Sequence, residues 1–110
     1  MCRALIVLCV AEDANALAEL KLATVSAEWE LAQGAVGMRS ALDQVDAERP
    51  HVLVAFGDQA ELVGLVRERF EAMRIVTDRD TPGATVVATS LDEVRGLVKD
   101  LPRPGGPVGA

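Results

Sequence analysis

Aromatic side chains are scarce in this sequence. It contains no tyrosine, and Trp29, Phe56 and Phe70 are its only aromatic residues. Single-stranded nucleic acids are bound by stacking bases on aromatic side chains, so the composition argues against a site of that kind. Basic residues are also outnumbered, 11 against 17 acidic ones, and the formal net charge is −6. Because no basic stripe is present to follow a phosphate backbone, we expect no direct nucleic-acid partner.

Cysteine and histidine are rare as well. Cys2 and Cys9 lie in or beside the first apolar run without CxxC spacing, a pattern that supports neither a disulfide framework nor a cysteine metal site. We expect Cys9 to act as a small buried hydrophobic residue. His51 is the only histidine, and it precedes an apolar run. We therefore expect it at the start of a strand, far from the edge where catalytic groups would lie.

Long hydrophobic runs are missing too. No run approaches the roughly 20 apolar residues of a membrane span, so we expect no membrane partner. The apolar run at residues 3–10 is followed at once by Glu12 and Asp13 and has no small-residue cleavage site. This favours a first strand over a signal peptide. Together with the cysteine usage, it predicts a cytoplasmic protein.

Half of the residues are hydrophobic, and they follow two periodicities. Continuous apolar runs predict buried strands, and the alternating stretch at residues 28–32 predicts a half-exposed edge strand, with a continuation of the preceding helix as the rival interpretation. Apolar residues at helical spacing predict helices, the first capped by Asp13 and the last opened by a capping box of Ser90 and Glu93. The predicted buried strands are residues 3–10, 51–56 and 73–77, and a further strand is predicted at residues 85–89. The predicted helices are residues 14–25, 38–48, 61–70 and 91–101.

The alternation of these elements predicts an α/β fold with a three-layer, doubly wound, mostly parallel five-stranded sheet. Residues 1–101 are predicted to form one domain and residues 102–110 a flexible tail rich in proline and glycine. Only residues 78–84 link the last two strands, whereas a parallel crossover usually needs a dozen or more residues. Either the link is an unusually tight bridge or the last strand runs antiparallel.

Ligands of doubly wound folds bind beyond the carboxyl ends of the strands. The candidate ligand-binding residues at that edge are Glu12, Asp13, Asp58, Thr77 and Asp78. Carboxylate oxygens are preferred ligands of Mg²⁺, so Glu12, Asp13 and Asp58 are the candidate metal ligands. Helix capping and turn formation account for the same aspartates without any ligand, and we expect no resident cofactor, with Mg²⁺ as the alternative. Glycine-rich phosphate-binding motifs are absent, which disfavours a nucleotide site.

Two segments carry a family resemblance. Residues 32–42 (AQGAVGMRSAL) are similar to the A-x-G-x-x-A-L stretch of response-regulator receiver domains, with extra residues between, and residues 48–54 (ERPHVLV) to their E-R-P-D-L-V-L run. Glu12 and Asp13 resemble the acidic pair of that family, shifted outward by about a residue, and Thr77 falls where receivers carry threonine or serine. The resemblance implies a receiver-like, flavodoxin-like fold and a role in signal transduction.

The departures from the family pattern bear on function. Counting from Pro50, the position of the phospho-acceptor aspartate holds Phe56, and Asp58 comes two residues late. The position of the family's lysine falls near Ala88 or Thr89. The short link at residues 78–84 implies a missing or very short fourth helix. The resemblance therefore implies a pseudo-receiver, which is a non-catalytic regulatory domain and not an enzyme.

Such a domain acts through contacts with a partner protein or in a homodimer. The last helix is the candidate docking surface, with Arg95, Lys99 and Asp100 facing outward. The alternative function is a small-ligand or nucleotide-binding flavodoxin-like domain, which would use the loops at residues 12–15, 57–59 and 78–83.

Overall fold

The computed structural model describes residues 5–101 of the chain. Strands and helices alternate along most of this length, as the two periodicities predict. The elements in order are β1 (Leu5–Ala11), α1 (Ala14–Thr24), β2 (Trp29–Leu31), β3 (Ala35–Val36), α2 (Met38–Glu48), β4 (Val52–Ala55), α3 (Ala60–Arg69), β5 (Arg74–Thr77), β6 (Val86–Val87) and α4 (Leu91–Asp100).

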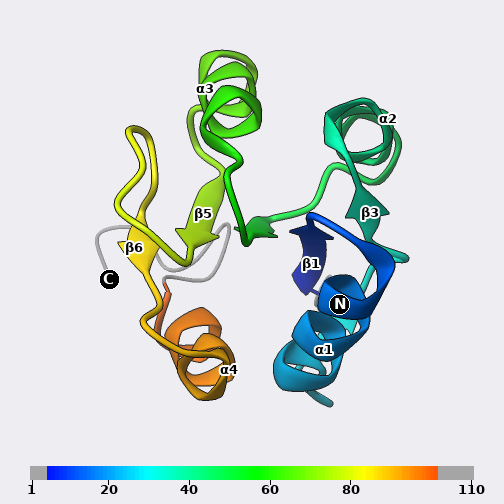
Figure 1. Cartoon of the computed structure of the whole chain (residues 1–110), viewed down its shortest axis with the longest axis vertical. Coiled ribbons are helices and arrows are strands. Elements are labelled where there is room, and N and C mark those ends of the chain that lie inside the picture. Colours follow the sequence, from blue (N-terminus) through cyan, green and yellow to red (C-terminus); the bar gives the residue numbers. More distant parts are fainter. Residues whose placement is uncertain (1–4, 102–110) are drawn as a thin grey trace.

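The strands form one sheet between two layers of helices. Its spatial order is β2-β1-β4-β5-β6, and β3 also pairs with β1. Every strand pairing within residues 5–101 is parallel. Helices α2 and α3 cover one face of the sheet, and α1 and α4 cover the other (Figure 1). The three-layer, doubly wound α/β architecture predicted from the sequence is confirmed.

The two faces of the sheet bury two separate aliphatic cores. Leu8 and Leu53 pack on the side of α2 and α3, whereas Val7 and Val54 pack on the side of α1 and α4. All of these side chains are fully buried. A strand that buries both faces needs apolar residues at consecutive positions, and this is the physical reason why β1 and β4 are continuous apolar runs in the sequence.

The sheet has six strands and not the predicted five. Strand β2 pairs with residues 5–7 of β1, and β3 pairs with Val10 and Ala11 further along the same strand. Gly34 and Gly37, both with φ of +92°, flank β3, and two residues are too few to produce a periodicity. The rival interpretation of residues 28–32 as a helix is wrong, because Trp29–Leu31 forms the edge strand β2.

The link between β5 and β6 is a tight parallel bridge. Strand β6 runs parallel to β5, so the antiparallel alternative is wrong. Residues 78–85 are all described and form no helix, which confirms the missing fourth helix. The link packs against α3, since a Cβ placed on Gly83 would lie 3.2 Å from Cγ1 of Val63 (Figure 1).

One arginine of α3 braces this link. The Nε and Nη2 groups of Arg67 donate to the carbonyl of Gly83 at 3.1 and 2.7 Å. Its Nη1 group donates to the carbonyls of Glu71 and Met73 at 2.7 and 2.9 Å. The planar fork of the guanidinium thus ties the end of α3 to the loop that stands in place of a helix.

The two predicted helix caps have different outcomes. Asp13 caps α1 as predicted, because its Oδ1 accepts from the Ala16 N–H at 2.8 Å. The prediction of a capping box at the start of α4 is wrong. Ser90 occupies the N-cap position, but its side chain makes no capping hydrogen bond within the described chain. The Glu93 carboxylate accepts instead from the backbone N–H and the hydroxyl of Thr89, at 3.0 and 2.6 Å.

Two predictions concern the ends of the chain. Cys2 and the predicted tail at residues 102–110 lie outside the described residues, and the boundary of a single domain at residue 101 stays a prediction. Within residues 5–101, none of the helices has the length and apolar character needed to cross a membrane.

Candidate functional site

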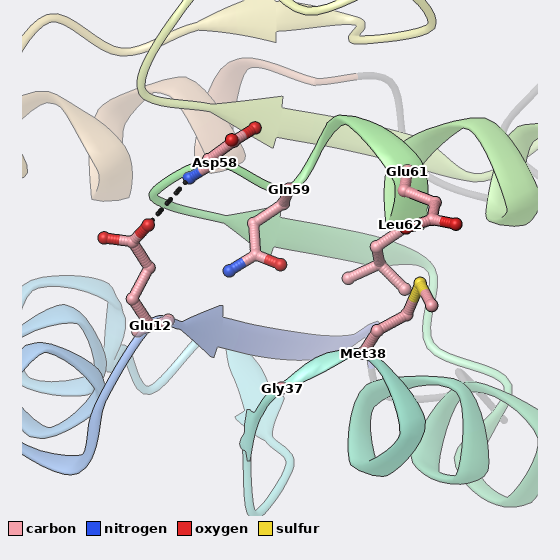
Figure 2. A pocket seen from close by; sticks show the side chains of 8 residues that line it. Glu12, Gly37, Met38, Asp58, Gln59, Glu61 and Leu62 are labelled. Carbon is pink, nitrogen blue, oxygen red and sulfur yellow. Dashed lines mark hydrogen bonds between the residues drawn. The ribbon is translucent and has the colours of Figure 1, made fainter.

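Three loops meet at the edge where the parallel strands end. The Gly57 N–H, after β4, donates to Oδ1 of Asp78, after β5, at 3.1 Å. The next backbone amide, that of Asp58, donates to Oε2 of Glu12, after β1, at 3.2 Å (Figure 2). The structure thus brings Glu12, Asp58 and Asp78 together, as their positions after neighbouring parallel strands lead us to expect.

Gly57 permits this close approach. Its φ is +93°, a conformation that favours glycine. A Cβ at this position would lie 2.4 Å from Cγ of Glu12, nearer than real Cβ contacts. The side chain of Glu12 therefore crosses directly over Gly57, and any larger residue would displace it.

The other two candidate residues, Asp13 and Thr77, are engaged elsewhere. Asp13 turns toward its own helix as the α1 cap. Thr77 is buried, with 1% of its surface exposed, and its hydroxyl donates to the carbonyl of Arg79 at 2.7 Å. Each side chain makes a bond inside the protein that explains its residue type without a ligand.

Sequence analysis missed Arg79. Its Nε donates to Oδ1 of Asp78 at 3.1 Å. The Asp78 carboxylate raises the pKa of the Arg79 guanidinium, and the charges of Glu12 and Asp58 act in the same direction. The available signal was a basic residue between Asp78 and Asp80 in the turn, but the pattern could not show which carboxylates it would face.

The geometry does not assemble the predicted magnesium ligands. Of Glu12, Asp13 and Asp58, only Glu12 and Asp58 lie together. Among residues 5–101, no group of three or more histidine, cysteine, aspartate and glutamate side chains is arranged to hold a metal ion. The Arg79 guanidinium pairs with the neighbouring Asp78 at 3.1 Å. The residues present fit Mg²⁺ poorly, and the magnesium site stays an untested prediction.

A pocket of about 390 Å³ lies beside these loops. The acidic residues Glu12, Asp58 and Glu61 line it together with the apolar residues Met38 and Leu62 (Figure 2). Ala11, Gly37 and Gln59 complete the lining. The pocket therefore combines an apolar wall with negative charge.

The structure shows what surrounds the two positions at which the sequence departs from the resemblance to receivers. Phe56 follows β4 directly, and its half-buried ring packs on the core of the α1 and α4 side. Ala88, after β6, is fully buried, and the hydroxyl of Thr89 donates to Glu93.

His51 lies away from the loop edge, and Cys9 is shielded from it. The Nδ1 atom of His51 accepts from the Ile6 N–H at 3.0 Å, at the opposite edge of the sheet, as expected. Cys9 is fully buried, which confirms its expected role as a small hydrophobic residue. Burial raises the pKa of the Cys9 thiol to about 11, against smaller lowering effects of Thr24 and Lys21, so the nucleophilic thiolate is suppressed.

Comparison of the sequence with protein families and with curated proteins finds no match. Solved structures with the same fold do exist. The chemotaxis response regulator CheY4 of Vibrio cholerae is similar with a TM-score of 0.69 and 19% identity, over 88% of this chain and 97% of that chain. The response regulator domain of Thermotoga maritima CheB is similar with a TM-score of 0.69 and 14% identity, over 89% and 92%.

HP1043, an orphan response regulator of H. pylori, is similar with a TM-score of 0.68 and 10% identity, over 86% of this chain and 93% of that chain. Each of these similarities covers 86–89% of this chain. The chain therefore has the fold of a response-regulator receiver domain, as the resemblance in its sequence implied.

Proposed function

We propose that this chain is a pseudo-receiver, a non-catalytic regulatory module that acts through protein contacts. The observation that carries the proposal is Phe56 at the end of β4, where the resemblance places the phospho-acceptor aspartate. A phenyl ring has no oxygen with which to attack a phosphoryl group. The ring also packs on an aliphatic core, so it serves the fold.

The groups that would assist phosphoryl transfer are also missing or engaged. Such transfer depends on cations and hydrogen-bond donors aimed at the phosphoryl oxygens. Ala88 and Thr89 hold the place of the family's lysine, and the Thr77 hydroxyl donates to the carbonyl of Arg79. Asp58 is the nearest aspartate to the acceptor position, but it lies two residues further along the chain.

Incubation with acetyl phosphate and MgCl₂, followed by intact-mass spectrometry, tests the absence of phosphotransfer. We expect no acid-stable or acid-labile phosphoryl adduct on the wild-type chain. Asp58→Asn is the matched variant and should behave identically. An adduct on the wild type that disappears in Asp58→Asn would show that Asp58 has taken over as acceptor, and it would contradict the proposal.

We place the proposed docking surface where apolar side chains are exposed. Leu22 and Val25, at the end of α1, are 73% and 48% exposed. The residues of α4 predicted to dock are already engaged in part: Arg95 donates to the carbonyls of Val25 and Leu22 at 2.8 and 3.0 Å. Lys99 is 3.7 Å from a carboxylate oxygen of Glu28. Exposed apolar side chains lose water on binding, which makes the end of α1 the better candidate.

Analytical ultracentrifugation across a range of concentrations tests the homodimeric form of this proposal. We expect the wild type to self-associate and Leu22→Glu to remain monomeric. Val87→Glu is the control, because Val87 is 38% exposed at the β6 edge and not on α1. A dimer that survives Leu22→Glu and is lost in Val87→Glu would move the contact to the sheet edge.

The pocket favours a second candidate function, the binding of a small ligand. Its carboxylates repel phosphate groups, so a cationic ligand with an apolar part complements it better than a nucleotide. A thermal-shift comparison of spermidine with Mg-ATP separates the two chemistries. For this function we expect spermidine to raise the Tm of the wild type by several degrees and to have less effect on Glu61→Gln.

A further inference from the structure

We propose that two copies of this chain pair through α1 and α4, with Leu22 of each copy seated over Gly96 of the other. The proposal rests on the homodimeric form of the proposed function. It adds the second helix of the contact and the register in which the two copies meet. Three observations carry it: an open glycine, a protruding leucine beside it, and opposite charges on the two helices.

Gly96 is an open position in the middle of α4. Glycine lowers the stability of a helix interior, and the usual reasons for it do not apply here. The φ of Gly96 is not positive, and no heavy atom of another described element lies within 4 Å of a Cβ placed on it. The monomer therefore does not require glycine at this position, whereas the close approach of another molecule would.

Leu22 protrudes next to Gly96 and is 73% exposed. The Leu22 carbonyl accepts from Nη2 of Arg95, the residue that precedes Gly96, at 3.0 Å. The two positions therefore lie at the same level of neighbouring helices, which cover the same face of the sheet (Figure 1). One face of the molecule thus carries a large apolar side chain and a gap side by side.

A second copy of the chain supplies the complement of both features. A twofold axis between α1 and α4 exchanges the two helices, so each Leu22 lies over the Gly96 of the other copy and loses its contact with water. Gly64 in α3 is open in the same way, but the neighbouring α2 has no large exposed hydrophobic residue. The matching pair of features therefore occurs on the face of α1 and α4 and not on that of α2 and α3.

The charges on the two helices fit the same register. Arg95 of α4 donates to the Leu22 carbonyl. One turn later, Lys99 lies 3.7 Å from a carboxylate oxygen of Glu28, which follows α1, so the two helices run in the same direction. The twofold axis therefore sets α1 antiparallel to α4 of the other copy. Glu19 is one turn before Leu22 and Lys99 is one turn after the open glycine, so this arrangement brings opposite charges together across the contact.

Glutamine substitutions at the two open glycines test the contact. Glutamine favours a helix over glycine and meets open space at both positions in the monomer, so Gly96→Gln and Gly64→Gln should each raise the Tm of dilute protein by a few degrees. In analytical ultracentrifugation we expect Gly96→Gln to raise the dimer Kd roughly tenfold or more, because its side chain fills the space that Leu22 needs. The matched control, Gly64→Gln, should leave the Kd within about twofold of the wild type.

Disulfide formation tests the register. In a Cys2→Ser background, protein carrying Leu22→Cys is mixed with protein carrying Gly96→Cys and oxidised. We expect a disulfide between the two proteins, because the proposed register sets these positions opposite each other, and little cross-linking of either protein with itself. Cys9 is fully buried and does not compete.

A charge exchange tests the flanking pair. Glu19→Lys and Lys99→Glu should each raise the dimer Kd. The double variant should bring the Kd back toward that of the wild type, because the opposite charges then face each other in reverse. A double variant as weak as the single ones overturns the proposed register.

The remaining outcomes separate this proposal from the proposed function. Equal Kd values for Gly96→Gln and Gly64→Gln, or a Leu22→Cys protein that cross-links mainly with itself, overturn the proposal. The homodimeric function stands in that case if Leu22→Glu still abolishes the dimer. A wild type that remains monomeric at every concentration overturns both, while the absence of phosphotransfer is decided by the acetyl phosphate experiment alone.

Discussion

Residues 5–70 and residues 74–101 contribute to one sheet in different ways. In the first part, β1 and β4 are fully apolar and lie between two helical layers, so successive side chains enter two cores. In the second part, β6 has two residues, Val87 is 38% exposed, and a loop stands where the receiver resemblance implies a helix. Both parts contribute buried apolar side chains to the cores, including Ile75, Val94 and Val98 of the second part, but only the second contains a parallel link without a helix.

This difference shows that one polar side chain can stabilise a connection that usually needs a helix. Arg67 reaches from α3 to the carbonyls of Gly83, Glu71 and Met73. A guanidinium supplies several donors in one plane, so one side chain can bond to three carbonyls of the loops around it. A second arginine, Arg79, belongs to the second part itself and lies at the loop edge.

The largest expected effect is in the first part. Leu53→Ala removes a fully buried side chain of β4 and leaves a cavity, so it should lower the free energy of unfolding by about 2–5 kcal/mol. Val87→Ala, on β6, should cost less than about 1 kcal/mol because the side chain keeps contact with water. Urea denaturation measures both. Equal costs would contradict the contrast in packing between the two parts.

Arg67→Ala tests the bracing of the link at residues 78–85 by α3. Loss of charged donors to several carbonyls should lower the free energy of unfolding by about 1–3 kcal/mol. Native-state hydrogen exchange should also accelerate at residues 78–85 before it does so in β1. Arg67→Lys should recover only part of the stability, because an ammonium lacks the planar fork. Uniform acceleration across the sheet would mean that Arg67 has no local bracing role.

The pH dependence of the free energy of unfolding tests the burial of Cys9 in the first part. Its folded pKa is about 11 against an ordinary 9.0, so the folded state keeps the proton over a range in which the unfolded thiol loses it. The contribution of the Cys9 thiol to the free energy of unfolding is constant below pH 9. It declines as pH rises from 9 to 11, and at pH 10 it has fallen by about 1 kcal/mol. Cys9→Ala should lack this part of the decline in Tm. An identical pH profile for both proteins would refute the prediction.

The smallest effects distinguish the caps of the first and last helices. Asp13→Ala removes a capping bond of α1 and should cost about 1 kcal/mol. Ser90→Ala should cost less than about 0.5 kcal/mol, since Ser90 makes no capping bond in the described chain. Thermal unfolding followed by circular dichroism compares the two variants. A larger loss for Ser90→Ala would show that the α4 cap forms in solution.

Much of the fold was predictable because it follows from local periodicity. The predicted helices and buried strands match α1 to α4 and β1, β4 and β5 to within one or two residues at each described end. The two-residue strand β3 was missed because its pairing with Val10 and Ala11 depends on partners distant in sequence. The direction of β6 stayed open for a related reason, since it depends on how residues 78–85 pack against α3.

The candidate site was predictable only in part. The placement of Glu12, Asp58 and Asp78 at one edge follows from parallel strands, whose carboxyl ends coincide. The engagement of Asp13 with its helix, and of Thr77 with the Arg79 carbonyl, depends on side-chain directions that no spacing rule contains. The same holds for Arg79, whose role requires knowing which carboxylates it faces.

The layered α/β architecture follows from which residue types occupy consecutive positions, so the amino-acid sequence was enough to predict it. The tertiary structure alone decided which side chains meet at the loop edge and how the missing helix is replaced. Those features depend on hydrogen bonds between segments far apart in the chain, such as Asp58 with Glu12 and Arg67 with Gly83. Such bonds require the loops to lie side by side, and the aliphatic sheet is what positions them there.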